Sequence, residues 1–289
     1  MATFTDHALE IVELDDPVVI NQLYKHGEAV TPTDLIGGDG FSVLKYQSQS
    51  ALALVHHEKL TLVKDIPEFS GVKTRDAAQS CFLWSLKNRA LTVCLGSAGS
   101  GKTYLSSAFA VHALEREGKN VVLLKPTRFV GGDSNAIAAV PGGISEKLEP
   151  YVESFQQHLR TLVGWGVEQK MMDWQSKRML EFAAVELCRG RHFANSIVIL
   201  DEAQNLSFHE LSSVISRVDD TSKLVILGDP LQIDTPDTAW EDTGLSKLLS
   251  STAWFNSDFA AVVELHTSYR GKLANLVAEA LLELRGTTM

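Results

Sequence analysis

Apolar runs of about five residues recur along the chain, and stretches with helical spacing separate them. The runs at 91–95, 120–124, 196–200, 223–227 and 261–265 predict buried strands. Helices are predicted at 76–87, at 103–117, at 144–162 with an interruption at Glu149-Pro150, at 171–187, at 207–218 and after Arg270. Strands that alternate with helices predict an α/β fold with a central, mostly parallel sheet.

The first part of the chain has a different pattern. Residues 41–46, 51–56 and 59–64 alternate between apolar and polar positions and predict three short strands, while 5–14 fits a short strand or a helix. We therefore expect a small, mostly β N-terminal region at residues 1–74, followed by an α/β domain at residues 75–289.

Composition narrows the range of functions. The 289 residues are 45% hydrophobic and carry a net charge of −10, so a nucleic-acid site would have to be a local basic groove. Cys81, Cys94 and Cys188 are too few and too scattered for a metal site or a disulfide framework, which predicts a cytoplasmic protein. Neither a signal peptide nor an apolar run of about 20 residues is found, so no membrane association is expected.

One stretch carries a phosphate-binding pattern at every fixed position. It lies where a predicted strand turns into a predicted helix, as such a loop requires. Its residues are Gly96, Ser97, Ala98, Gly99, Ser100, Gly101, Lys102 and Thr103. The glycines allow backbone N–H groups to surround phosphate oxygens at a helix N-terminus. Lys102 is predicted to reach the β- and γ-phosphates of ATP, and the Thr103 hydroxyl to bind Mg²⁺.

Acidic and amide side chains follow two further predicted strands. Asp201 and Glu202 end the strand at 196–200, and Asp229 and Gln232 follow the strand at 223–227. Ligands of α/β sheets bind at these carboxyl ends. Asp201 is therefore predicted to bind Mg²⁺, Glu202 to act as the general base, and Asp229 and Gln232 to face the γ-phosphate. Gln79, in the helix before the phosphate loop, can present a donor and an acceptor to adenine.

Together these segments resemble the PhoH family of ATPases over about residues 75–285. The matching stretches are 96–103, Lys125-Pro-Thr-Arg128, 141–151, Arg189-Gly-Arg191, 201–205 and 228–234. The resemblance implies a RecA-like P-loop NTPase similar to one motor domain of superfamily 1 helicases. It also implies an adenine-reading role for Gln79, γ-phosphate contacts for Gln232 and Arg270, and a homo-oligomeric, hexameric ring.

The same resemblance covers residues 41–75, which look like the connector in PhoH proteins that carry a PIN ribonuclease. About forty residues precede that connector, too few for a PIN domain, so nuclease activity is not expected. The glycine-rich loop also lacks an aromatic residue that the family tends to have, which weakens a base-stacking role for it.

The sequence is compatible with more than one function. The first is an ATPase that acts on RNA or another single-stranded nucleic acid, which would contact Lys125, Arg128 and the loop at 131–143. Arg128 could instead form an ion pair with an acidic residue. Arg217 is a second candidate for a γ-phosphate contact, supplied to a neighbouring subunit. The second function is a P-loop kinase of a small molecule, and the third is a nucleotide-controlled binding module; a GTPase would need an Asn-Lys-x-Asp motif, which is absent.

Overall fold

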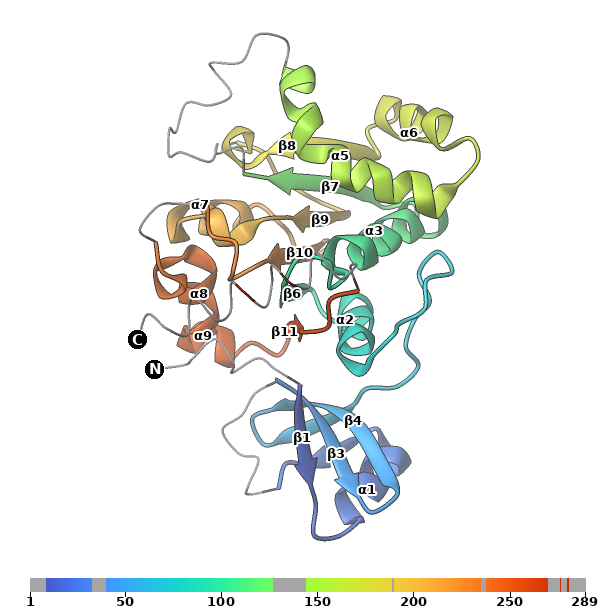
Figure 1. Ribbon diagram of the computed structural model, residues 1–289, viewed down its shortest axis with the longest axis vertical. Coiled ribbons are helices and arrows are strands. Elements are labelled where there is room, and N and C mark those ends of the chain that lie inside the picture. The colour runs from blue at the N-terminus through green and yellow to red at the C-terminus, as the bar shows by residue number, and fades with distance from the viewer. Residues whose placement is uncertain are drawn as a thin grey trace.

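The computed structural model describes residues 9–32, 40–126, 144–188, 190–234 and 238–269, together with residues 276 and 280; for 144–152 it describes the backbone alone. The predicted contact loop at 131–143, Arg128 and Arg270 lie outside the described residues. Two sheets make up the fold, a six-stranded one that carries the phosphate loop and a five-stranded one near the N-terminus (Figure 1).

The larger sheet is parallel throughout. Its strands are β6 (Leu91–Gly96), β7 (Asn120–Lys125), β8 (Leu180–Ala184), β9 (Ser196–Leu200), β10 (Lys223–Gly228) and β11 (Ala260–Leu265), in the order β11-β6-β10-β9-β7-β8. The carboxyl ends of β6, β10, β9 and β7 therefore lie side by side at one edge. The predicted α/β architecture, with the phosphate loop between a strand and a helix, is confirmed.

Helices cover both faces of this sheet (Figure 1). One face is covered by α2 (Ala77–Asn88), α3 (Lys102–His112), α5 (Ile144–Val163) and α6 (Val167–Ser176), and the other by α7 (Phe208–Ile215), α8 (Gly244–Leu249) and α9 (Thr252–Phe255). Short helical turns follow at η3 (Ala113–Glu117), η4 (Val185–Leu187), η5 (Ala203–Asn205) and η6 (Trp240–Asp242). Because consecutive strand residues point to opposite faces, Cys94 packs in the first core and Val93 in the second.

Two helix starts follow the sequence closely. The Asp76 carboxylate accepts a hydrogen bond from the Gln79 backbone N–H at 2.7 Å and caps α2. Ser207 and Glu210 form the capping box predicted for α7. These short-range contacts fix where both helices begin.

Two helix predictions are wrong. The expected helix at 171–187 ends early: α6 stops at Ser176, and residues 180–184 form β8, which pairs with β7 at the sheet edge and packs Phe182 against Phe155. The break expected at Pro150 does not occur, because α5 runs from Ile144 to Val163. Phe155 and Leu159 bury α5 against the core, and this packing outweighs the helix-breaking tendency of one proline.

The N-terminal region is mostly β, as predicted. Its strands are β1 (Glu10–Glu13), β2 (Glu28–Val30), β3 (Gly40–Tyr46), β4 (Gln49–His56) and β5 (Lys59–Leu62), in the order β1-β3-β4-β5-β2. The sequence analysis missed α1 (Val18–His26), which Pro17 opens and which buries Ile20 and Leu23 against this sheet.

The two sheets share packing through α2 and α3. The ring of Phe41 on β3 meets Trp84 edge-on with centroids 6.1 Å apart, and Phe69 lies 4.8 Å from Phe109. The boundary between residues 74 and 75 stays a prediction. Among the described residues, no helix is both long and apolar enough to cross a membrane.

Candidate functional site

The phosphate loop joins β6 to α3 and depends on its glycines. Gly96, Gly99 and Gly101 all have positive φ, at 146°, 85° and 102°. A Cβ on Gly96 would lie 2.5 Å from the Leu265 carbonyl oxygen, so only glycine fits beside β11. Lys102 starts α3, and its ammonium donates to the carbonyls of Gly96 and Ser97. The lysine thus curls over its own loop, where phosphate oxygens would replace these carbonyls.

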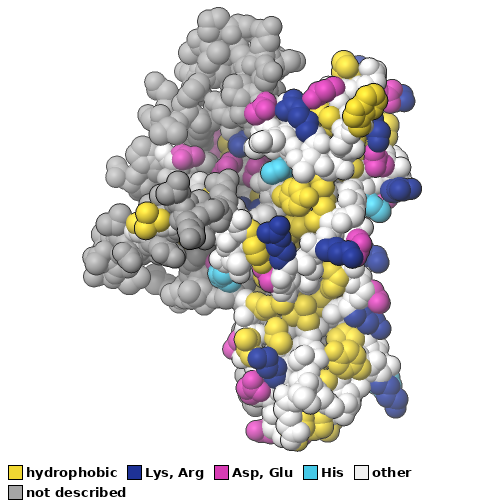
Figure 2. All heavy atoms as spheres, turned by 45° about the vertical axis from the view of Figure 1, so that its right-hand side comes forward, with side chains coloured by type: hydrophobic (Ala, Val, Ile, Leu, Met, Phe, Trp, Pro, Cys, Tyr) yellow, Lys and Arg dark blue, Asp and Glu magenta, His cyan; other side chains and the backbone are white. Residues whose placement is uncertain are grey.

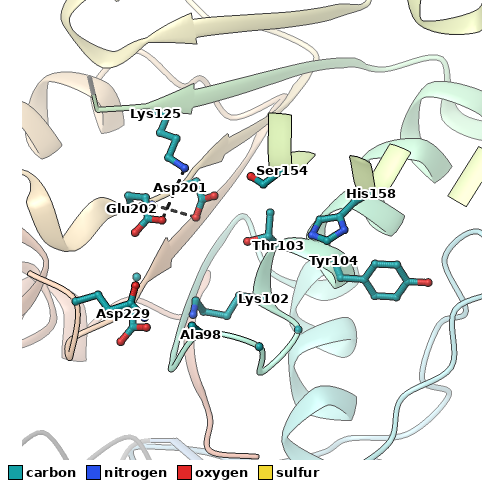
Figure 3. Close-up of a pocket in the computed structure, with 14 residues that line it drawn as sticks. Ala98, Lys102, Thr103, Tyr104, Lys125, Ser154, His158, Asp201, Glu202 and Asp229 are labelled. Carbon is teal, nitrogen blue, oxygen red and sulfur yellow. Dashed lines mark hydrogen bonds and ion pairs between the residues drawn. The ribbon is translucent and has the colours of Figure 1, made fainter. Parts of the chain in front are cut away.

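A cavity of about 460 Å³ lies above this loop, and carboxylates form its opposite wall (Figure 3). Asp201 and Glu202 come from the end of β9, and Asp229 comes from the end of β10. Thr103 and Lys102 line the side formed by the phosphate loop. The structure therefore brings together the residues predicted from two separate motifs.

Two carboxylates of this wall are buried, which disfavours their charged form. Asp201 is 7% exposed and Asp229 is 4% exposed. Burial raises the pKa of both carboxyl groups, with the charge of Glu202 adding to the effect, while Lys102 opposes it. One oxygen of Asp229 is buried and has no hydrogen-bond partner among the described residues. A buried, unpartnered carboxylate oxygen beside a cavity is suited to a cationic ligand.

Gln204 ties the carboxylate wall together, and the sequence analysis gave it no role. Its amide nitrogen donates to Glu202 Oε2 at 2.7 Å and to the Gln232 carbonyl at 2.9 Å, and its amide oxygen accepts from the Asp229 backbone N–H at 3.0 Å. Asn205 makes a reciprocal pair with Asp234, at 2.9 and 2.8 Å. Both lie in the Asp-Glu-Ala-Gln-Asn segment, whose polar residues after a buried strand were the available sequence evidence.

Glu202 itself has an unusual backbone. Its φ is 57° and its ψ is 36°, a left-handed conformation that is rare for residues other than glycine, asparagine and aspartate. Lys125, at the end of β7, lies with Nζ 3.7 Å from Glu202 Oε1 (Figure 3). Lys125 therefore lines the nucleotide cavity, while its predicted contact with nucleic acid stays a prediction.

The remaining predicted residues lie at different places. Gln232 lines the cavity with an exposed side chain. Gln79 is 4% exposed and holds the loop to α2: its Oε1 accepts from the Arg75 backbone N–H at 2.9 Å, and its Nε2 donates to the Ser100 carbonyl at 3.1 Å. Arg217 does not line the cavity; its guanidinium donates to the Ser213 carbonyl and hydroxyl at the end of α7.

A second cavity, of about 190 Å³, lies on the other side of the phosphate loop. Gln79, Gly99 and Tyr104 line it, together with Arg75 and Tyr269. The Arg75 guanidinium lies 4.8 Å above the Tyr269 ring, and the Tyr269 backbone N–H donates to the Gly99 carbonyl at 3.0 Å. Tyr104 lines both cavities, so a ligand could extend from one to the other across this residue.

Comparison with known proteins agrees with this arrangement. The model of the PhoH family, described as PhoH-like protein, matches residues 71–281, which include the whole phosphate loop and the carboxylate wall. The chain belongs to the PhoH family. The resemblance stated from the sequence is thereby confirmed, and the family together with the phosphate loop supports a P-loop NTPase.

Individual PhoH relatives are moderately similar. The PhoH-like protein of Bacillus subtilis (strain 168) is 31% identical over 167 residues, which cover 57% of this chain and 50% of the relative. Protein PhoH2 of the same organism is 30% identical over 226 residues, covering 76% of this chain and 50% of that protein. The chain thus spans about half the length of these relatives. The crystal structure of Pif1 helicase from Candida albicans aligns with a TM-score of 0.38 and 17% identity over 74% of this chain and 44% of that one.

The PhoH site fits a magnesium ion. P-loop NTPases bind Mg²⁺ through the Thr or Ser after the lysine, the Walker-B aspartate and the phosphates. Thr103 and Asp201 are the residues predicted for these positions, and both line the cavity. Hydroxyl and carboxylate oxygens are the ligands that Mg²⁺ prefers, and the unpartnered oxygen of Asp229 adds negative charge nearby. No cluster of three or more His, Cys, Asp or Glu residues suited to a metal occurs in the described part of the chain.

The described surface of this PhoH-family chain offers no continuous basic stripe on the face that Figure 2 shows. Lys and Arg side chains are scattered there among acidic ones. An electrostatic footprint for nucleic acid would be a cluster of basic side chains. The face in view therefore adds no support for a nucleic-acid site.

Proposed function

We propose that this chain hydrolyses ATP in a magnesium-dependent reaction at the cavity between the phosphate loop and the carboxylate wall. The observation that carries the proposal is the convergence of Lys102, Thr103, Asp201 and Glu202 on one cavity of about 460 Å³. Lys102 and Thr103 come from the start of α3, and Asp201 and Glu202 follow β9. A phosphate-loop lysine, a Walker-B aspartate and a residue that orients water are the parts that recur in P-loop NTPases.

Each side chain has a role in this proposal. Lys102 turns from its own loop carbonyls to the β- and γ-phosphates. Glu202 orients the attacking water and takes its proton, and the exposed Gln232 lies at the rim beside the γ-phosphate. Thr103 and Asp201 would hold a Mg²⁺ ion, which would supply positive charge to the phosphate oxygens. Arg270 supplies a further γ-phosphate contact within the same chain, with Arg217 as the alternative from a neighbour.

The second cavity is the proposed site of the adenine base of ATP. It adjoins the phosphate loop, is lined by the Tyr269 ring and the Arg75 guanidinium, and contains Gln79 in its wall. A flat aromatic ring and a cation suit a purine. Both ends of the Gln79 amide already bond to backbone, so adenine recognition would use its second lone pair or its second hydrogen.

The wider setting of the reaction is also part of the proposal. We infer that the ATPase acts with RNA or another single-stranded nucleic acid in the cytoplasm, and that subunits form a homo-oligomeric, hexameric ring. The segments that resemble helicase motors support the first inference, and the family resemblance supports the second. A kinase would turn over ATP only with an acceptor, and a binding module would not turn over ATP at all.

The deciding experiment compares Lys102→Ala with Glu202→Gln. The first removes the charge that holds the phosphates, so nucleotide binding weakens. The second keeps the phosphate loop and removes the base, so ATP binds and persists. Titration calorimetry and ATP turnover, each with and without Mg²⁺ and single-stranded RNA, would measure both effects, and a mass measurement would give the assembly size. Near-normal hydrolysis by Glu202→Gln would contradict the assignment of the base.

A further inference from the structure

Lys125 has a position that the proposed reaction leaves unexplained. It ends β7, the strand beside β9, and its side chain enters the cavity from above the carboxylate wall (Figure 3). Its ammonium lies 3.7 Å from Glu202 Oε1. The Lys125 side chain is 19% exposed and that of Glu202 is 37% exposed, so the pair lies at the mouth of the cavity and remains accessible to a ligand.

Glu202, the proposed general base, has a partner at each of its carboxylate oxygens. Glu202 Oε2 accepts from Gln204 at 2.7 Å, and Oε1 faces the Lys125 ammonium. Each carboxylate oxygen of Glu202 thus faces one polar side chain. Each carboxylate oxygen can accept about two hydrogen bonds, so the Lys125 ammonium competes with water for the positions on Oε1.

The two partners differ in how firmly they are held. Gln204 is 1% exposed, and its amide also bonds to the Gln232 carbonyl and the Asp229 backbone, so it is fixed by three contacts. Lys125 approaches from a flexible four-carbon side chain at a long distance, and such partly exposed ion pairs are weak. Lys125 is therefore the partner that leaves.

The charge of the cavity indicates where Lys125 goes. Lys102 and Lys125 are the lysines among its described lining residues, facing the carboxylates of Asp201, Glu202 and Asp229. A triphosphate introduces a γ-phosphate with oxygens that bear more charge than one carboxylate. An ammonium already at the cavity wall would move to that group, and ADP has no such group to offer.

We propose that Lys125 senses the γ-phosphate: it pairs with Glu202 in the empty and ADP-bound site, and moves to the γ-phosphate when ATP binds, which releases the base. Lys125 thereby discriminates ATP from ADP and couples recognition of the triphosphate to activation of Glu202. This inference rests on the proposed ATPase activity of the same cavity.

The test measures binding of ADP and of a non-hydrolysable ATP analogue to the full chain by titration calorimetry. Lys125→Met should weaken the analogue about tenfold, the loss typical of one hydrogen bond to a charged group, and change ADP affinity less than about twofold. Lys119→Met removes the same charge just before the other end of β7 and should change neither affinity. Lys125→Arg should keep most of the discrimination, since it keeps the charge.

Two outcomes would overturn the inference. Equal loss of affinity for ADP and the analogue would make Lys125 a general binding residue, and no loss for either would leave it without a sensing role. Turnover of the wild type and of Glu202→Gln, measured on the same preparations, separates this inference from the proposed function. If the wild type does not hydrolyse ATP, the function fails while the affinities still test Lys125; if it does and Lys125→Met binds both nucleotides normally, the inference alone fails.

Discussion

The two walls of the nucleotide cavity are built in different ways. The phosphate-loop wall is a continuous segment, 96–103, whose shape comes from glycine backbone angles. The carboxylate wall is assembled from the ends of β9 and β10, with Gln204 linking Glu202 to the turn after β10. The first wall is therefore contiguous in the sequence, and the second exists only when the sheet has formed. We expect changes in the loop wall to affect mainly nucleotide binding, and changes in the carboxylate wall to affect mainly catalysis.

Gly96→Ala should give the largest effect, because it breaks the loop wall. The new Cβ would lie 2.5 Å from the Leu265 carbonyl, at a φ of 146° that disfavours alanine. We expect a loss of about 3 kcal/mol in the free energy of unfolding, since clash and backbone strain add, and loss of nucleotide binding. Thermal denaturation and ADP titration would measure both.

Gly118→Ala is the matched control. Gly118 also has a positive φ, 63°, but nothing lies within 4 Å of its Cβ position. It should cost about 1 kcal/mol from backbone conformation alone and leave ADP affinity unchanged. If Gly96→Ala binds ADP as well as this control does, the loop wall does not depend on close approach to β11.

Gln204→Ala should disrupt the carboxylate wall and leave the phosphate-loop wall intact. Without its amide, Glu202 and the turn after β10 lose their common partner. Misplacement of a catalytic group by about 1 Å can cost about 10²-fold in rate, so we expect kcat to fall by about that factor while KM changes less than about threefold. Steady-state ATP turnover checks this, with the exposed Gln157→Ala as control. A KM increase with unchanged kcat would contradict the division between the walls.

The same division explains what could be predicted from the sequence. The residues of the loop wall are contiguous, and the caps at Asp76 and Ser207 bond to residues three positions away, so all were identified from their spacing. Gln204 links Glu202 to the Asp229 backbone and the Gln232 carbonyl, which are 25 and 28 positions away, so its spacing in the sequence did not indicate this role. The Lys125–Glu202 pair joins residues 77 positions apart, because β7 and β9 are neighbours in the sheet.

The errors in the fold have a similar cause. Residues 180–184 form β8 because they pair with the edge of β7. This pairing outweighs a local pattern that favoured a helix. The helix α1 was missed for a different reason: its apolar residues Ile20 and Leu23 form only a short stripe, in a region where turn signals dominate. Pro17 at its start was the available sequence evidence.

Glu264→Gln should make the stability of the folded chain less dependent on pH. Glu264 lies on β11 opposite Leu95, is 3% exposed, and has one oxygen without a partner among the described residues; His266 Nδ1 lies 3.6 Å from the other. Burial raises the pKa of this carboxyl from 4.5 to about 7. Between these values the folded chain binds more protons than the unfolded chain, so the contribution of Glu264 to stability falls as pH rises from 4.5 through 7.

The neutral glutamine removes this dependence. At pH 8 the variant should be more stable than the wild type by on the order of 2 kcal/mol, and the difference should shrink as pH falls toward 4.5. Urea denaturation of both chains at several pH values measures it. A difference that does not change with pH would mean that Glu264 is charged in the folded protein throughout this range.

Arg217→Ala should give the smallest effect, because Arg217 contacts neither wall. Its guanidinium bonds to Ser213 at the end of α7, and its Nε is buried without a partner among the described residues. Losing the helix-end contacts and relieving the unpartnered group oppose each other, so stability should change by less than about 1 kcal/mol. Turnover should stay within about twofold if the γ-phosphate arginine is Arg270 in the same chain, since an arginine finger is worth about 10³–10⁵-fold. If Arg217→Ala is instead inactive, mixing it with inactive Lys102→Ala subunits decides the matter: restored activity would mean that Arg217 completes a neighbour's cavity, and the preference for Arg270 would be wrong.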